Sequence, residues 1–322
     1  MRVAILGAGA TGGFLGARLA RAGTDVVLIA RGPHLQAMRE SGLRLIEPDG
    51  ESIVRVEATD DLESVRSADF VFVTLKAHSV PAMAGRLAAS LGAGTAVVSA
   101  QNGIPWWYFQ RHGGELDGTH LETVDPGGMI GRMIDPQRVI ACIVYPATSV
   151  VAPGIVRHVE GERFSLGELD GSHTERIAAL SGLLTGAGLK APVQPRIRQE
   201  LWVKLMGNAV FNPLSALTRA SLGAMAESPV LAPVVRAAME EVDAVAGRLG
   251  IEIPVSIDQR VRGAARVGDH KTSMLQDLEA ARPLEIDAIT GSVVELAGRL
   301  GVPVPHLETI YASVKVLADT KP

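Results

Sequence analysis

The chain has 322 residues, which is longer than one hydrophobic core usually needs and predicts two domains. Hydrophobic residues make up 47% of it, charged residues 20% and aromatic residues only 4%, a balance typical of a globular α/β protein. The formal net charge of −4 argues against a nucleic-acid-binding surface, and the single cysteine, Cys142, allows no internal disulfide, which suits a reducing cytoplasm.

The N-terminal segment begins with a short apolar run, residues 2–6, that we expect to form a buried parallel strand. A helix and a second strand, residues 25–30, complete a βαβ unit of the length that dinucleotide-binding proteins use. The turn between them fits G-x-G-x-x-G through Gly7, Ala8, Gly9, Ala10, Thr11 and Gly12. Gly7 would permit the turn, Gly9 would let the backbone approach a pyrophosphate, and Gly12 would allow close helix packing. The alternative is a glycine-rich turn without a ligand.

The second strand leads into Arg31, where an NAD-preferring protein usually carries an acidic residue for the ribose 2′-hydroxyl. A guanidinium group can instead bind a 2′-phosphate, so Arg31 favours NADP(H) over NAD(H). The alternative is an arginine that is merely solvated at the end of a strand.

Two further apolar strands, residues 69–75 and 95–100, end just before Lys76 and Asn102. Ligands of open α/β sheets bind at the carboxyl ends of the strands, so both side chains are candidates for cofactor or substrate contacts. For Asn102, an ordinary Asn-Gly turn is an equally simple reading.

The aromatic run 104–111 contains Trp106 and Trp107 and either roofs a substrate pocket or packs as a small core of its own. The polar, glycine-rich residues 117–136 are expected to form an extended insertion. Later strands are expected at 139–147, 154–159 and 163–169, in an order that the sequence does not define.

The longest uncharged runs, 87–110 and 139–156, are broken by Gly, Pro, Asn or Gln, so no membrane insertion is expected. A helix at 173–188 precedes Pro192 and Pro195, which mark the predicted boundary between domain 1–195 and domain 196–322. The second domain reads as helical, with Ser228-Pro229 as the start of a helix that ends at Gly250. The run 273–277 precedes a segment through Pro283, after which helical patterns lie at 284–301 and 306–319.

The helix at 199–218 is the most distinctive element, because Lys204, Asn208 and Asn212 recur at intervals of four and share one face. Pro213 removes a backbone N–H and predicts a kink or loosening at 209–213. A charged amine among Met, Val, Phe, Leu and Trp indicates a functional role. The alternative is a lysine that extends to solvent beside asparagines that bond to nearby loops. A helical domain beside a dinucleotide-binding domain predicts a small-molecule site in the cleft that they form.

With these motifs in place, the chain resembles the ketopantoate reductase (2-dehydropantoate 2-reductase) family along almost its whole length. The resemblance rests on GAGATGG at 7–13, TLKA at 74–77 with QNG at 101–103, ELWVKL-x-x-N-x-x-x-NPL at 200–214, and SMLQD at 273–277 with EID at 285–287. It implies a Rossmann-type doubly wound sheet followed by an all-α domain of the 6-phosphogluconate dehydrogenase C-terminal-like type.

The resemblance also implies reduction of ketopantoate to (R)-pantoate by NADPH in pantothenate biosynthesis, with Lys204 as the proton donor. Asn208, Asn212 and Ser273 would bind the substrate, and Asn102 would touch both substrate and cofactor. Arg31 and Lys76 would serve the adenosine end of the cofactor. Glu285 would bind the nicotinamide ribose, and a residue near Ala147 would bind the cofactor through its backbone; Ser273 and Glu285 rest on the resemblance alone.

Two departures from the family pattern concern the substrate. Leu222 stands where related enzymes often carry a polar substrate contact, and both the aromatic run 104–111 and the insertion before Arg138 are unlike the family's compact loops. Another branched or bulky 2-oxo acid is therefore an alternative substrate, and a non-catalytic NADP redox sensor is the alternative from another class. No metal is expected, because no cysteine–histidine cluster is present. The sequence leaves open whether the chain acts alone or as a homodimer.

Overall fold

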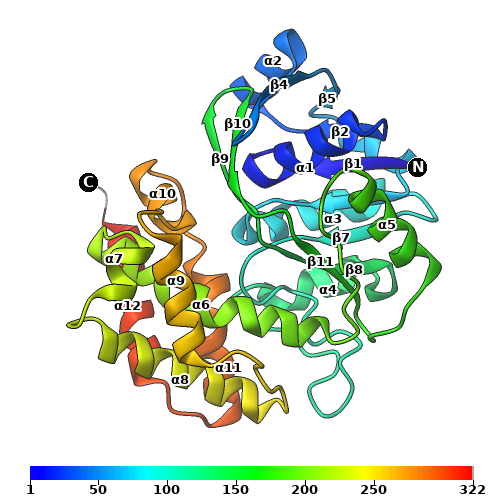
Figure 1. The fold of residues 1–322 in the computed structure, drawn as a ribbon. Helices are drawn as coiled ribbons and strands as arrows, with labels where there is room; N and C mark the ends of the chain where they lie inside the picture. The colour runs from blue at the N-terminus through cyan, green and yellow to red at the C-terminus, as the bar shows by residue number, and fades with distance from the viewer. Residues whose placement is uncertain (321–322) are drawn as a thin grey trace. The chain divides into compact units, whose positions relative to one another are not determined.

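A computed structural model describes residues 1–320, which form two compact units (Figure 1). The first unit contains residues 1–101, 109–119 and 128–197. The second contains residues 102–108, 120–127 and the chain from Arg198 onward. The expected boundary at 195 did not include the two short segments that leave the first unit, and one of them begins at Asn102.

The first unit is built on a seven-stranded sheet in the order β11-β8-β7-β6-β1-β2-β5. All neighbouring strands are parallel except β8 and β11, which are antiparallel. Read from β5 to β8, this is the 3-2-1-4-5-6 strand order of the Rossmann fold, and it confirms the predicted fold class. The strands are β1 (Arg2–Leu6), β2 (Asp25–Ile29), β5 (Glu57–Thr59), β6 (Phe70–Val73), β7 (Ala96–Ser99), β8 (Val139–Val144) and β11 (Phe164–Glu168).

A second, four-stranded sheet in the order β4-β3-β10-β9 belongs to the same unit. Its strands are β3 (Leu43–Glu47), β4 (Gly50–Val54), β9 (Ala147–Ala152) and β10 (Ile155–Glu160). Helix α1 (Ala10–Arg21) packs against it: Phe14 stacks on His158 of β10 with ring centroids 4.3 Å apart, and Arg18 pairs with Glu47 of β3 at 2.6 Å. The sequence pattern predicted β10 but not β3, β4 or β9 of this sheet, nor the three-residue β5 of the first sheet.

The remaining helices of the first unit connect the strands. They are α2 (Gly32–Ser41), η1 (Leu62–Ser67), η2 (Ala77–Ser79), α3 (Val80–Ser90), α4 (Met129–Met133), η4 (Pro136–Arg138) and α5 (Glu175–Gly186). Within residues 1–320, no helix is both long enough and apolar enough to cross a membrane.

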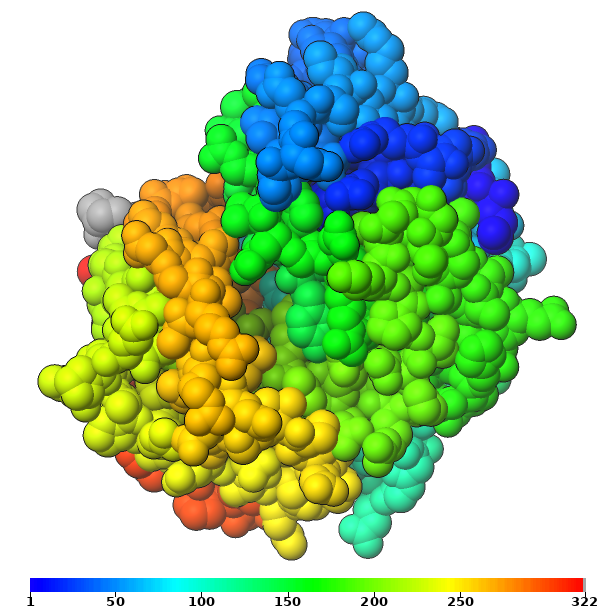
Figure 2. All heavy atoms as spheres, viewed as in Figure 1, coloured from blue at the N-terminus to red at the C-terminus, as the bar shows by residue number. Residues whose placement is uncertain are grey.

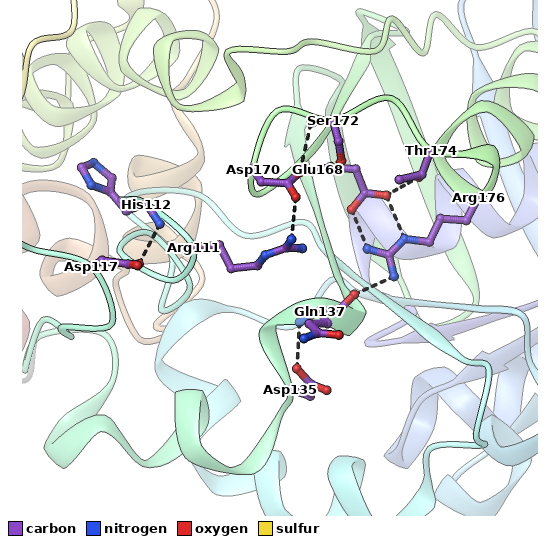
Figure 3. A network of polar contacts seen from close by, with 10 residues as sticks. All are labelled: Arg111, His112, Asp117, Asp135, Gln137, Glu168, Asp170, Ser172, Thr174 and Arg176. Carbon is purple, nitrogen blue, oxygen red and sulfur yellow. Dashed lines mark hydrogen bonds and ion pairs between the residues drawn. The ribbon is translucent and has the colours of Figure 1, made fainter. Parts of the chain in front are cut away.

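A buried ionic network fixes the end of β11 (Figure 3). The Glu168 carboxylate is only 1% exposed; it accepts hydrogen bonds from Arg176 at 2.5 and 2.8 Å and from the Thr174 hydroxyl at 2.5 Å. Arg176 also donates to the carbonyl oxygen of Gln137 at 2.7 Å, which ties η4 to α5. The hydrogen bond and ion pair with Glu168 raise the pKa of Arg176 above its ordinary value. The network is a structural feature of the first unit, because a buried carboxylate is stable only when it is fully paired.

The second unit is helical. It contains α6 (Ile197–Thr218), α7 (Leu222–Glu227), α8 (Ala232–Arg248), α9 (Ile257–Val267), α10 (Ser273–Glu279), the π-helix η5 (Asp287–Gly291), α11 (Ser292–Leu300) and α12 (Pro305–Asp319). Neither α7 nor α9 was predicted. The expected helix start at Ser228-Pro229 was wrong, because Ser228 instead accepts a turn bond from the Leu231 N–H and Pro233 occupies the first turn of α8.

The segment at 117–136 is folded rather than extended, contrary to expectation. Leu121, Val124 and Asp125 are buried, and the backbone N–H groups of Glu122 and Thr123 both donate to the Glu295 carboxylate of α11 at 2.9 Å. Burial opposes the charge of Glu295, but these bonds, the Thr123 hydroxyl and Arg299 outweigh it and lower the pKa of that carboxyl. This pairing accounts for the membership of residues 120–127 in the helical unit.

Candidate active site

The glycine loop after β1 is closely packed at two of its glycines and open at the third. Gly7 has φ +102°, and a Cβ there would lie 2.9 Å from Leu75, while a Cβ on Gly12 would collide with Thr74 and the Gly7 carbonyl. Gly9 is exposed, and a Cβ there would meet only the Gly7 carbonyl oxygen at 3.9 Å. Internal packing therefore explains Gly7 and Gly12 but not Gly9, whose missing side chain leaves room for a ligand to approach the backbone.

The start of α1 presents backbone donors. The N–H groups of Ala10, Thr11 and Gly12 have no acceptor among residues 1–320, and the first turn contains neither an acidic residue nor a side-chain cap. A helix N-terminus of this kind suits a phosphate group. The Thr11 and Thr148 hydroxyl oxygens are 3.4 Å apart, which places the start of β9, with Ala147, beside this loop. The residues present thus fit a dinucleotide pyrophosphate.

His34 is hydrogen-bonded to the glycine loop, a role that no sequence motif indicated. Its Nδ1 accepts a hydrogen bond from the Gly154 N–H at 2.9 Å, so its Nε2 carries the proton and donates to the Ala8 carbonyl oxygen at 2.9 Å. Burial lowers the pKa of His34, and the bond to Ala8 offsets only part of this effect. The neutral imidazole therefore fixes the glycine loop to the turn between β9 and β10.

Arg31 and Lys76 lie at the carboxyl ends of β2 and β6. Arg31 precedes α2 as its N-cap residue and is exposed, and its guanidinium group makes no hydrogen bond or ion pair with any of residues 1–320. Lys76 is half-buried and precedes η2, just after the Thr74–Leu75 pair that packs on Gly7. Of the two, Arg31 has the exposure and the charge that a phosphate-binding group needs.

Lys204 and Asn102 are in direct contact within the helical unit. The Lys204 ammonium group donates a 2.7 Å hydrogen bond to Asn102 Oδ1, and both residues are half-buried. They are separated by 102 positions in the sequence, but Asn102 is part of the segment that joins the helical unit. Asn102 follows the carboxyl end of β7, as the sequence predicted, and the segment that begins with it belongs to the same unit as the lysine.

The position of Asn102 is set by its neighbour Gly103 and by the π-helix η5. Gly103 has φ +82° and lies directly on the Ala288 carbonyl, where a Cβ would overlap the oxygen. The Ile104 N–H donates to the same carbonyl at 2.9 Å, and the Ser292 hydroxyl donates to it at 2.6 Å. π-helical turns are rare and often occur at functional sites. Here the turn provides the carbonyl that holds the Asn102 loop.

The two other residues of the α6 stripe carry carboxamides without internal partners. Asn208 is half-buried and Asn212 is 6% exposed, and neither side chain has a hydrogen-bond partner in the described chain. Buried amides are normally bonded, so these two groups are available to a ligand. This observation goes against the alternative in which the asparagines serve nearby loops.

The helix α6 is continuous through Pro213, so the expected loosening does not break it. Pro213 provides no N–H for the Ala209 carbonyl, four residues earlier, and the Thr290 hydroxyl donates to that carbonyl at 3.0 Å instead. Side-chain compensation of this kind lets the asparagine stripe continue along one helix.

Ser273 is the first residue of α10, and Thr272 rather than Ser273 is its N-cap. The Ser273 hydroxyl is exposed and has no partner among the described residues, whereas the Thr272 hydroxyl bonds to Ser215 of α6. The start of α10 therefore lies against α6 one turn beyond Asn212. Glu285 is buried just before η5.

The aromatic run 104–111 is a core element. Trp106, Trp107 and Tyr108 are at most 5% exposed, and the Trp202 indole donates a 2.7 Å hydrogen bond to the Tyr108 hydroxyl. Burial raises the pKa of Tyr108, despite opposing effects of Trp202 and Arg198. These contacts decide between the two readings of the run: it packs as a small core.

Leu222 is half-buried at the start of α7, where its N–H donates to the His270 carbonyl at 2.9 Å.

Comparisons with known proteins agree with this arrangement. The family model described as ketopantoate reductase PanE/ApbA matches residues 3–171, and its C-terminal counterpart matches residues 196–318. The chain belongs to the ketopantoate reductase family. This confirms the resemblance seen in the sequence and makes the protein an oxidoreductase that acts on a CH–OH/C=O pair. No group of three or more metal-binding side chains is assembled within residues 1–320.

Individual relatives align along their full length. A 2-dehydropantoate 2-reductase of Mesorhizobium japonicum is 49% identical, over 99% of this chain and 98% of the relative. A solved protein of Ralstonia solanacearum, assigned provisionally as a ketopantoate reductase, is 40% identical with a TM-score of 0.93, covering 99% of this chain and 98% of that one. A D-mandelate dehydrogenase solved with NADH and anilino(oxo)acetate shares the fold at 22% identity, with a TM-score of 0.84 and 99% of both chains covered.

Proposed function

We propose that this member of the family reduces 2-dehydropantoate (ketopantoate) to (R)-pantoate with NADPH, a step of pantothenate biosynthesis. The observation that carries the proposal is the 2.7 Å hydrogen bond from Lys204 to Asn102. Lys204 lies on the same helix as Asn208 and Asn212, whose carboxamides have no hydrogen-bond partners in the described chain. A redox sensor would need the glycine loop and Arg31 but not this polar set. The names of the relatives support the same substrate.

Lys204 has the role of proton donor. When bound, the nicotinamide supplies a hydride to the ketone carbon, and negative charge develops on the ketone oxygen. An ammonium group held by Asn102 stabilises that charge and delivers the proton. Asn102 keeps the amine in a fixed position, so little reorganisation is needed as the charge develops.

The other residues of the site have binding roles. Asn208, Asn212 and Ser273 would hydrogen-bond the substrate. Gly9 and the N–H groups of Ala10 to Gly12 would hold the pyrophosphate, and Arg31 the 2′-phosphate. Lys76, Ala147 and Glu285 complete the proposed cofactor contacts on the strength of the family resemblance.

The deciding experiment measures NADPH oxidation against a panel of 2-oxo acids that includes ketopantoate, pyruvate and 3-methyl-2-oxobutanoate. We expect the highest kcat/KM with ketopantoate. A higher value with another branched acid would support the alternative substrate class that Leu222 raises, and no turnover with any acid would support the sensor. Sedimentation of the same sample would show whether the enzyme is a single chain or a homodimer.

A further inference from the structure

Gly207 is an unusual residue for the middle of α6. Glycine weakens a helix interior, and this one lies between Lys204 and Asn208 on a helix that is otherwise rich in large apolar residues. A Cβ at Gly207 would lie 2.5 Å from Nε and Nη2 of Arg260 and 2.8 Å from its Cζ. The missing side chain thus makes room for a guanidinium group that lies on the helix surface.

Arg260 reaches this position from α9. Ser256 and Gln259 form a capping box that fixes the start of α9, and Arg260 follows directly. Its Nη2 donates to the Lys204 carbonyl oxygen at 3.3 Å, and the side chain is half-buried. In Figure 1, α9 crosses in front of α6, and Figure 2 shows α9 and α10 (yellow-orange to orange) at the surface of the helical unit. A cation is therefore held along one turn of α6, between Lys204 and Asn208.

A 2-oxo acid needs such a cation. Its carboxylate is ionised at neutral pH, and the groups assigned to the substrate above are neutral amides, a hydroxyl and one ammonium group that interacts with the ketone oxygen. Arginine is the side chain best suited to a carboxylate, because its planar group can donate two parallel hydrogen bonds.

We propose that Arg260 binds the substrate carboxylate and that Gly207 is the glycine that makes this possible. The inference rests on the proposed function, since it assigns the charged end of the same substrate. Each of the two cations then has its own role: Lys204 interacts with the ketone oxygen, and Arg260 binds the carboxylate. It also makes the site selective for 2-oxo acids over neutral ketones of the same shape.

The test compares ketopantoate with its carboxamide, which keeps the shape and loses the charge. The variants are Arg260→Ala, Arg260→Lys and Gly207→Ala, with Arg262→Ala and Gly263→Ala as controls from exposed positions of α9. A lost bond to a charged group predicts that Arg260→Ala lowers kcat/KM for the acid by roughly 10- to 100-fold, chiefly through KM. For the carboxamide we expect less than about a threefold change, because a neutral amide offers one acceptor oxygen instead of two and no charge to the guanidinium group. Guanidinium ion added to this variant should restore part of the loss.

Arg260→Lys and Gly207→Ala test whether the planar guanidinium group and its place on α6 matter in addition to the positive charge. Arg260→Lys should recover only part of the discrimination, because ammonium cannot bond the carboxylate through two parallel donors. Gly207→Ala should change the ratio of acid to carboxamide in the same direction as Arg260→Ala, since the methyl group displaces the guanidinium. The controls should leave that ratio unchanged.

Equal losses for acid and carboxamide would overturn the inference, because they would make Arg260 a structural clamp between α9 and α6. Should Arg260→Ala fail to fold, Arg260→Lys and Gly207→Ala decide the question. Calorimetric binding of pantoate in the presence of NADP separates this inference from the proposed function. An unmodified protein that binds pantoate through Arg260 but reduces no 2-oxo acid would contradict the proposed function alone, and pantoate binding unaffected by Arg260→Ala would contradict the inference.

Discussion

The Thr290 hydroxyl donates a 3.0 Å hydrogen bond to the Ala209 carbonyl, the group that Pro213 leaves without a helical donor. All three residues are buried, so without this bond the carbonyl would be desolvated and unpaired. We expect Thr290→Val to reduce the free energy of unfolding by about 1 to 3 kcal/mol, measured by urea denaturation.

The cause can be isolated with a double-mutant cycle. Pro213→Ala restores an N–H that can bond to Ala209, so Thr290→Val should cost less in that background by about 0.5 kcal/mol or more. Additive effects would mean that Thr290 acts through packing alone. Thr290→Ser keeps the hydroxyl and serves as the matched control.

The second prediction concerns Lys204. If the ammonium group acts chiefly in the transition state, Lys204→Ala should lower kcat by about 10² to 10⁴ and leave NADPH affinity nearly unchanged. Steady-state kinetics and NADPH titration measure the two effects. Lys190→Ala, at an exposed position of the first unit, should be neutral. A near-normal kcat in the Lys204 variant would assign the lysine a structural role only.

The third prediction concerns cofactor choice. Arg31 is exposed, its guanidinium group makes no hydrogen bond or ion pair with the described residues, and it stands where an acidic residue would select NAD. Arg31→Ala should raise the KM for NADPH and reduce the ratio of kcat/KM with NADPH to kcat/KM with NADH. Arg55→Ala, at another exposed position, should change neither quantity. Equal use of both cofactors by the unmodified enzyme would refute the assignment.

These residues also show what the sequence could predict. The glycine loop, Arg31 and the α6 stripe were found because the geometry of one turn or one helix determines which residues are neighbours. Three contacts join residues that are far apart in the sequence: Asn102 with Lys204, Thr290 with Ala209, and Arg260 with Gly207, at separations of 102, 81 and 53 residues. No local pattern encodes such pairs, because they depend on how the helices pack.

The aromatic run shows a different limit. A dense group of apolar rings predicts burial, but it does not say whether protein or substrate covers the rings. The bond from Trp202 to Tyr108 answers this within the helical unit. The wrong helix start at Ser228-Pro229 has a similar origin, since a Ser-Pro pair suits a turn as well as a helix cap.

The fourth prediction is a pH dependence of stability. Burial lowers the pKa of His34 in the folded chain, with partial compensation by the Ala8 carbonyl, while the unfolded value is about 6.5. The unfolded chain therefore binds a proton at a higher pH than the folded chain. The stability contributed by neutral His34 is complete above about pH 6.5 and is lost as the pH falls below it toward the folded pKa.

Urea denaturation at about pH 7.5 and about pH 5.5 tests this, because one unit of pKa difference corresponds to about 1.4 kcal/mol. The loss of stability between the two conditions should be smaller in His34→Gln than in the unmodified protein. It should be unchanged in His78→Gln, whose side chain is exposed. The same pH dependence in all three proteins would show that His34 does not contribute to it.

The last prediction concerns the hydroxyl group of the substrate. Ketopantoate carries a carboxylate, a ketone and a terminal hydroxyl, whereas 3-methyl-2-oxobutanoate lacks the hydroxymethyl group. The carboxamides of Asn208 and Asn212 and the Ser273 hydroxyl have no partners in the described chain, so a hydroxyl-free substrate would leave at least one of them unpaired. A site built to bond a hydroxyl rejects an analogue without it far more strongly than a pocket that measures only apolar fit.

We therefore expect kcat/KM for 3-methyl-2-oxobutanoate to be lower by about 10² or more. If the Asn212 carboxamide binds the hydroxyl, Asn212→Ala should reduce the ratio of kcat/KM for ketopantoate to kcat/KM for 3-methyl-2-oxobutanoate, because both substrates would then lack the bond. Leu222→Asn places a polar group where the family often has one, and it should raise the preference for ketopantoate if position 222 lines the pocket. Faster reduction of the hydroxyl-free acid by the unmodified enzyme would show that the site selects an apolar side chain, and it would change the substrate without changing the roles of Lys204 and Arg260.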